Sequence, residues 1–234
     1  MQKTSPCQTF NIEELIIHHL MLQSVFLRKN GLLYGKSGIT IAFFECGRFW
    51  NNPVYSDYAK ELKDSLPNKI EDNLPLDFAT GLCGFGWGIE YMIQNHFIES
   101  NSAEICEGID QRIMTLNMRR ITDISLESGL EGFLHYILIR LKGEIMRKTH
   151  LLFDETYLKD TYDRLLSFPE RTIKQNFVTF METGLLTYQP DISLFTNDLE
   201  IKNEDDILSA KLGLADGLAG ILVRKATNKK TFRS

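Results

Sequence analysis

Apolar positions along this chain follow two patterns that alternate from one end to the other. Nearly unbroken apolar runs occur at residues 39–44 and 133–141. Other stretches are more polar, and their apolar residues recur every three or four positions, as at Ile105, Ile109 and Ile113. A helix with one apolar stripe lies at a surface, whereas a helix that is apolar all round is buried on several sides. The pattern therefore predicts an all-α protein in which buried inner helices alternate with amphipathic surface helices.

These patterns predict about five helix pairs in a single domain that spans residues 1–234. The expected surface helices cover residues 11–28, 54–66, 103–119, 155–167 and 192–210. The expected inner helices cover residues 36–48, 84–98, 130–142, 172–187 and 218–226. The stretch 176–180, "NFVTF", alternates only weakly, so it is assigned to the fourth inner helix rather than to a strand.

A short glycine motif opens four of the inner helices. Each copy reads G-x-x-G and is followed at once by Ile or Phe. The copies recur about every 45 residues, with one interval near twice that length, so one repeat lacks its glycines. Glycine lets the chain take conformations closed to other residues and lets two backbones approach closely. We therefore expect four copies of one structural turn, made by Gly35 and Gly38, Gly81 and Gly84, Gly129 and Gly132, and Gly217 and Gly220.

The first copy, within "NGLLYGKSGI", is similar to a nucleotide-binding loop, but its spacing is wrong. A phosphate-binding loop of that type needs four residues between its glycines and a strand before it. Here Gly31 and Gly35 enclose three residues, and the preceding stretch 11–28 has a helical period. Leucine replaces Lys36 in the other three copies. The motif therefore predicts a turn and no bound phosphate.

Composition and charge narrow the class of protein. The formal net charge of -5 and the lack of a basic stripe argue against a nucleic-acid partner. The four cysteines show neither metal-ligand nor disulfide spacing, which is typical of reduced thiols in a cytoplasmic protein. We expect no secretory signal, because the N-terminal stretch has no apolar core, and no membrane span, because long apolar runs are absent.

The repeated G-x-x-G-[IF] turn resembles that of the lanthionine synthetase C-like family, over a range from about Asn11 to Val223. The resemblance implies a double-layered α/α toroid, or an incomplete ring, of helix hairpins around a central cavity. In family members that cyclise peptides, it also implies one zinc ion that activates a cysteine thiolate for addition to a dehydrated serine or threonine. Zinc lowers the pKa of a bound thiol and so favours the nucleophilic thiolate.

The zinc ligands that the resemblance implies are absent from this sequence. In the cyclases they come from Trp-Cys-Tyr-Gly and Cys-His-Gly segments just before the glycine turns. The corresponding pairs here are Leu33–Tyr34, Ala79–Thr80, Glu127–Ser128 and Ala215–Asp216, with neither cysteine nor histidine. We therefore expect no metal and no other cofactor.

Four carboxylates and one histidine are the candidates for acid and base chemistry. The carboxylates, close to the turns, are Asp77, Glu127, Glu131 and Asp216. Paired carboxylates perform glycoside hydrolysis, but acids near a helix N-terminus also stabilise the helix dipole. His135 lies one turn into an inner helix, where it is either a catalytic base or a buried core residue.

Glu131 and two further residues are candidates to line the central cavity. Cys83 lies near the start of an inner helix, where the pKa of a thiol falls and a nucleophile becomes possible, although a packed small side chain is the alternative. Trp87 could stack on a ligand or fill the space left by the glycines around it.

Two hypotheses of different class follow. In the first, the chain keeps the scaffold, lacks the zinc site and binds a peptide or partner protein in the central cavity as an accessory protein of peptide modification. In the second, it is an enzyme whose cavity carries carboxylate and histidine chemistry, either glycosidase-like or an altered peptide-modifying activity.

Overall fold

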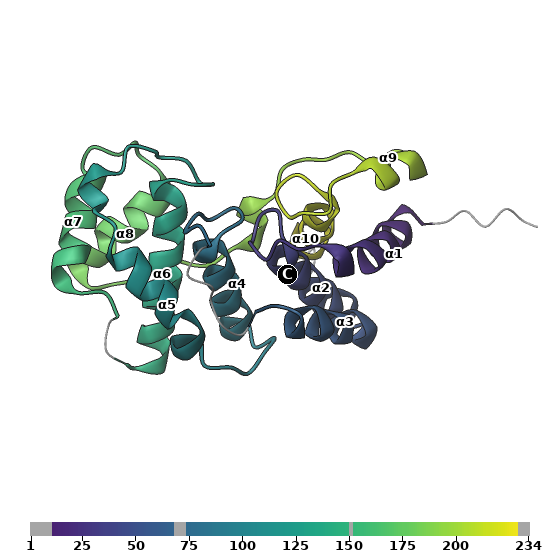
Figure 1. The fold of residues 1–234 in the computed structure, drawn as a ribbon, viewed down its shortest axis with the longest axis horizontal. Coiled ribbons are helices and arrows are strands. Elements are labelled where there is room, and N and C mark those ends of the chain that lie inside the picture. The colour runs from purple at the N-terminus through teal and green to yellow at the C-terminus, as the bar shows by residue number, and fades with distance from the viewer. Residues whose placement is uncertain (1–10, 68–73, 150–151, 229–234) are drawn as a thin grey trace, which may run out of the picture.

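The computed structural model describes residues 11–67, 74–149 and 152–228, and within these ranges the chain is helical and contains no strand. The all-α prediction is confirmed. The helices form an elongated body, with α7 and α8 at one end and α1 and α9 at the other (Figure 1). Their bounds are α1 Ile12–Gln23, α2 Lys36–Trp50, α3 Pro53–Asp64, α4 Leu82–Gln94, α5 Ser102–Met114, α6 Leu130–Arg147, α7 Glu155–Leu165, α8 Thr172–Thr183, α9 Glu204–Ser209 and α10 Leu218–Asn228.

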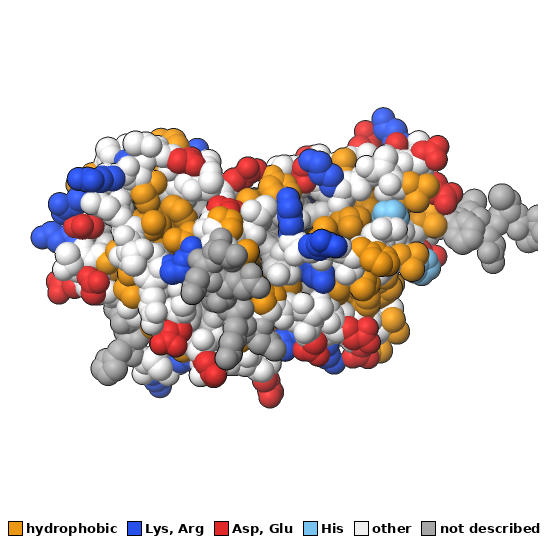
Figure 2. All heavy atoms as spheres, in the orientation of Figure 1, with side chains coloured by type: hydrophobic (Ala, Val, Ile, Leu, Met, Phe, Trp, Pro, Cys, Tyr) orange, Lys and Arg blue, Asp and Glu red, His pale blue; other side chains and the backbone are white. Residues whose placement is uncertain are grey.

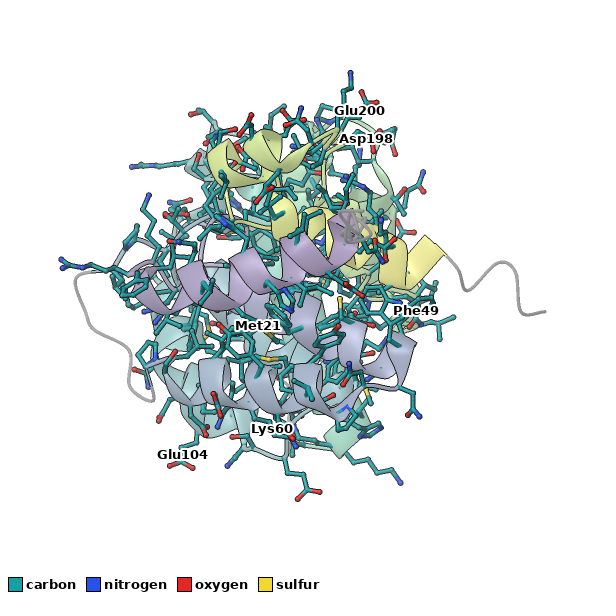
Figure 3. The ribbon with its side chains drawn as sticks, turned by 90° about the vertical axis from the view of Figure 1, so that its right-hand side faces the viewer. Met21, Phe49, Lys60, Glu104, Asp198 and Glu200 are labelled. Carbon is teal, nitrogen blue, oxygen red and sulfur yellow. The ribbon has the colours of Figure 1, made fainter. Side chains whose placement is uncertain are left out.

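The two kinds of helix begin in different ways. The surface helices α1, α3, α5 and α7 start after Asn11, Asn52, Asn101 and Asp154, whose side chains accept a backbone N–H of the first turn. The buried helices α2, α4 and α6 instead start after Gly35, Gly81 and Gly129 and have no side-chain cap. Seen from the end that carries α1 and α3, Met21 lies between these two helices, whereas Lys60 points outward (Figure 3).

All four G-x-x-G motifs lie in turns of the same geometry. In each, the first residue after the first glycine donates its backbone N–H to the carbonyl seven residues earlier, at 2.9 Å. The second glycines leave no room for a side chain, because a Cβ would overlap the carbonyl oxygen six residues earlier. Those carbonyls belong to Leu32, Phe78, Leu126 and Leu214. Close approach of backbone to helix therefore explains why glycine recurs here.

Backbone hydrogen bonds join these turns side by side. Leu33 N–H donates to the Ala79 carbonyl at 3.0 Å, and Ala79 N–H donates to the Glu127 carbonyl at the same distance. Leu214 N–H donates to the Leu33 carbonyl at 2.8 Å, so the last turn lies next to the first. The inner helices follow the same order, because α10 packs against α2, α2 against α4, α4 against α6 and α6 against α8.

The prediction of a surface helix over residues 192–210 is wrong. This part of the chain forms a 3-10 helix at Ile192–Phe195, an irregular stretch and then the short helix α9. It belongs to the long connection that leads from α8 across the middle of the molecule to α9 and α10 (Figure 1). Tyr188, Ile192 and Phe195 are buried there, and Phe195 packs on Phe78, Trp87 and His135 in the interior.

The visible surface carries charges of both signs, and the cysteines in the described ranges are buried. Acidic and basic side chains are interspersed over the face in Figure 2. Cys46, Cys83 and Cys106 are buried free thiols, and Cys7 lies outside the described residues. None of the helices described here is both long enough and apolar enough to cross a membrane.

Candidate functional site

A pocket of about 650 Å³ lies between α6, the start of α8 and the connection that follows α8. Two of the candidate residues, Glu131 and His135, line it from α6. They are four positions apart and therefore share one helix face. Arg171 lines the pocket at the start of α8, and Tyr188 and Phe195 line it from the connection. The pocket thus brings together segments that are distant in sequence.

His135 forms the buried wall of this pocket. Only 6% of the residue is exposed, and Phe78 and Phe195 lie against its ring at centroid distances of 5.7 and 4.9 Å. Its Nδ1 is 3.0 Å from the hydroxyl of Tyr188, which also accepts a hydrogen bond from Trp87 Nε1 at 3.0 Å.

These contacts select one tautomer of His135. The indole N–H of Trp87 can only donate, so the Tyr188 hydroxyl still has its own proton to place. Tyr188 is buried, and an unpaired hydroxyl proton there would cost about 1–3 kcal/mol. Nδ1 of His135 therefore accepts that proton, and Nε2 carries the ring hydrogen. Burial lowers the pKa of His135 to about 3, so the ring is neutral near pH 7.

We predict a measurable acid sensitivity from this histidine. In the unfolded chain the ring takes up a proton near pH 6.5, whereas in the folded protein it does so only near pH 3. Between these values the unfolded state binds more protons, so the free energy of unfolding falls as the pH is lowered. Urea unfolding at pH 6.5 and about pH 5 should give a loss of about 2 kcal/mol that is absent in His135→Gln. Equal losses in both proteins would contradict a buried neutral His135.

Glu131 and Arg171 form an ion pair at the mouth of the same pocket. The Glu131 side chain is 15% exposed and that of Arg171 is 45% exposed. Burial raises the pKa of Glu131, and the positive charge of Arg171 offsets part of this rise. Sequence reasoning found Glu131 but missed Arg171, whose only signal is its place at the start of a helix that lacks a capping residue.

The other three carboxylates do not reach the pocket. Asp77 stabilises its own turn, since its Oδ1 accepts the backbone N–H of Thr80 at 2.6 Å and that of Gly81 at 3.1 Å. Glu127 is exposed and accepts the hydroxyl of Tyr34 at 2.5 Å. This hydrogen bond, together with burial and the charges of Glu127 and Asp216, raises the pKa of Tyr34 to about 12.

Asp216 lies near the same tyrosine and forms an ion pair with Lys211 at 2.5 Å. Glu127 and Asp216 therefore lie around Tyr34, whereas His135 and Glu131 line the pocket. The four candidate carboxylates do not form one site.

Cys83 and Trp87 are packed inside the protein, and neither lines the pocket. Both are fully buried. Burial raises the pKa of the Cys83 thiol well above its ordinary value, which disfavours the thiolate that a nucleophile requires. The ring of Trp87 stacks on Tyr91 at a centroid distance of 5.0 Å, and its N–H is bonded to Tyr188. The indole ring of Trp87 and its N–H group therefore already contact other side chains of the protein.

A second polar cluster, absent from the sequence-based predictions, is enclosed between α4, α5 and α6. Arg140 is fully buried and donates to Asp110 through two nitrogens, at 2.6 and 3.1 Å, and to Glu90 at 2.7 Å. Asp110 also accepts the hydroxyl of Tyr136 at 2.6 Å, and Glu90 accepts from Arg147 at 2.9 Å. Arg140, Asp110 and Glu90 pair with one another away from solvent, whereas the side chain of Arg147 is 29% exposed, and the cluster links the three helices.

One sequence signal could have revealed this cluster. Glu90 and Arg140 each stand in an otherwise apolar run of an inner helix, within "GWGIEYMI" and "YILIRL". Charged residues are almost never fully buried unless they are paired. An acid inside the apolar run of one inner helix and an arginine inside that of a neighbouring inner helix therefore predict an ion pair between the two.

The residues before the turns do not fit a zinc ion. Tyr34, Thr80, Ser128 and Asp216 occupy these positions and offer neither thiolate nor imidazole. Across the described ranges, no group of three or more histidine, cysteine, aspartate or glutamate side chains could hold a metal ion.

Comparison with known proteins adds no relative. No protein-family model, curated protein or solved structure matches this chain. The resemblance to the lanthionine synthetase C-like family therefore stays a prediction from the repeated glycine turns.

Proposed function

We propose that this chain is a non-catalytic accessory protein that binds a peptide or a partner protein on a lanthionine synthetase C-like scaffold without the zinc cyclase site. In this proposal, the helices form an incomplete ring of hairpins held together by the glycine turns. The side-by-side turns, the order of the inner helices and the contact between the last and first repeats support it.

One observation favours binding over catalysis: the candidate carboxylates are separated and already paired. Asp77 holds its turn, Glu127 contacts Tyr34, Asp216 pairs with Lys211, and Glu131 pairs with Arg171. Glycoside hydrolysis needs two carboxyl groups that face one substrate. Only Glu131 reaches the pocket.

His135 fits a binding role better than the role of a general base. A pKa of about 3 makes the imidazole a weak proton acceptor at neutral pH. Its Nδ1 is engaged by Tyr188, and its Nε2 carries a hydrogen. The alternative function, an enzyme with carboxylate and histidine chemistry, would need a second acid or base beside Glu131 in this pocket.

The pocket has the size and the mixed lining of a ligand site. Its volume of about 650 Å³ lies in the range typical of small-molecule and peptide-side-chain pockets. Apolar groups from Leu126, Ile173 and Phe195 lie beside the polar groups of Glu131 and Arg171. Such a surface suits a short segment of peptide that offers both an apolar side chain and a polar group.

The proposal is tested by equilibrium dialysis against a pool of synthetic hexapeptides, with mass spectrometry of the retained peptides. Thr172 is exposed and lines the pocket, so Thr172→Trp should fill it and weaken retention by about tenfold or more. Gln175, exposed on the same helix but outside the pocket lining, provides the matched control Gln175→Trp, which should bind as the unaltered protein does.

Retention should also survive a metal chelator, and the retained peptides should keep their masses. Loss of retention with the chelator, equal retention by Thr172→Trp, or no retained peptide would each refute the proposal. A change in peptide mass during incubation would instead favour the enzyme alternative.

A further inference from the structure

The N-terminus of α8 opens into the pocket without a cap. The helix runs from Thr172 to Thr183, and its N-cap residue, Arg171, has an extended backbone and no side-chain capping bond. In the described part of the chain, no group accepts the backbone N–H of Thr172, Ile173 or Lys174. Arg171, Thr172 and Ile173 all line the pocket. Free N–H groups at a helix N-terminus, with the helix dipole behind them, attract anions.

A second donor reaches the same pocket from another helix. His135 is more than nine-tenths buried, and its Nδ1 is taken by Tyr188. Its Nε2 has no partner among the described residues, and it is not one of the side-chain atoms that the protein fully encloses. Since the residue lines the pocket, Nε2 opens onto it. The tautomer fixed by Tyr188 and Trp87 places a hydrogen on this nitrogen, so a buried donor without an acceptor points into the pocket.

The charged residues around these donors already include a carboxylate. Glu131, one helical turn before His135, pairs with Arg171 across the mouth of the pocket. The other titratable groups of α8, Lys174 and Glu182, bond elsewhere: Lys174 to Glu170, and Glu182 to the hydroxyl of Tyr162. Arg171 is therefore the cation that an anionic ligand would contact. Its present partner, Glu131, is a carboxylate, which is the kind of group that such a ligand would carry.

We propose that this pocket binds the terminal carboxylate of a peptide. The carboxylate would accept hydrogen bonds from the N-terminus of α8 and from His135 Nε2–H, and would pair with Arg171. The last side chain of the peptide would lie against Leu126, Ile173 and Phe195. This inference rests on the proposed function and adds to it the part of the peptide that is recognised.

The inference is tested with two forms of the hexapeptide pool, one with free C-terminal carboxylates and one with C-terminal amides. Amidation removes the charge and leaves the rest of each peptide unchanged, so retention should fall by about tenfold or more. Arg171→Gln should weaken retention of the free acids to a similar degree and leave the amides unaffected. Arg119→Gln removes an exposed arginine that pairs with Asp160 and Asp163 outside the pocket, and it should change neither.

The outcomes separate this inference from the proposed function. Equal retention of acids and amides, both lost in Thr172→Trp, would overturn carboxylate recognition while leaving a peptide-binding pocket. Retention of neither pool would overturn both proposals. Inorganic phosphate serves as a further probe: phosphate that binds more tightly than every free-acid peptide would identify a phosphate site and also overturn the inference. Circular dichroism confirms that each variant is folded.

Discussion

Replacing Arg140 with leucine is expected to destabilise the protein by about 4 kcal/mol, enough to unfold much of it at ordinary temperatures. The reason is that the buried carboxylates that pair with Arg140 would lose their counter-charge. Asp110 and Glu90 are buried, and their carboxylates face the guanidinium at 2.6–2.7 Å. Leucine fills much of the space but leaves the buried carboxylates of Asp110, Glu90 and Glu144, and Arg147 still pairs with the last two of these. An uncompensated buried charge is far more costly than a missing surface contact.

The measurement is urea unfolding of Arg140→Leu at neutral pH, followed by far-ultraviolet circular dichroism. Arg119→Leu is the matched control, because Arg119 also bridges two carboxylates but is 55% exposed. Exposed ion pairs contribute about 0–1 kcal/mol, so this control should lie close to the original protein. Arg140→Lys should fall between the two, since lysine keeps the charge but cannot pair with Asp110 through two nitrogens. Equal stability of Arg140→Leu and Arg119→Leu would mean that water reaches the cluster.

Helix positions could be predicted from the sequence because they depend on local patterns. Apolar runs and three-to-four spacing decide which residues face the interior of a helix, and this information is present in each segment by itself. The turns could be predicted equally well, because close approach of two backbones requires glycine at a fixed spacing and the motif repeats. These signals located α2, α4, α6 and α10 close to their observed starts.

The connection after α8 could not be predicted in the same way. Ile192 and Phe195 have the spacing of an amphipathic helix, yet they are held by contacts with distant segments. Phe195 packs on Phe78, Trp87 and His135 in the middle of the molecule, with centroid distances of 4.9–5.1 Å. Tertiary contacts of this kind override local propensity, and a single sequence gives no information on which segments meet.

The part of the candidate site that lies on α6 could be predicted from the sequence. Glu131 and His135 are four positions apart and therefore share a face of α6, so a site that includes one of them is expected to include the other. Arg171 and Tyr188 are 40 and 53 residues further along the chain from the residues that they contact. Their part in the site depends on how α8 and its connection fold back onto α6.

Replacing Gly84 with alanine is expected to destabilise the protein by about 3 kcal/mol or more, although alanine is the better helix former. Gly84 lies in the first turn of α4, directly over the turn that precedes the helix. A Cβ at this position would overlap the carbonyl oxygen of Phe78 and would also meet the Phe78 carbonyl carbon at 2.9 Å. Both atoms are backbone, so no side chain can rotate away and the turn itself must move.

That movement would disturb contacts well beyond the glycine. Leu82 N–H donates to the Pro75 carbonyl at 2.9 Å, and Phe78 N–H donates to the Glu127 carbonyl of the next turn at 2.8 Å. The Phe78 ring also packs against Trp87 and His135. A shift of the Phe78 backbone therefore reaches the neighbouring turn and the wall of the pocket together.

Gly108 provides the matched control for Gly84→Ala, measured by thermal unfolding of both variants. It lies inside α5, and a Cβ there would meet no atom within 4 Å. Gly108→Ala should therefore stabilise the protein by about 0.5–1 kcal/mol through helix propensity alone. The two substitutions are chemically identical, so opposite signs would isolate the close approach of helix and turn as the reason for glycine. A neutral or stabilising Gly84→Ala would instead show that the turn yields easily and that its glycines are not required by packing.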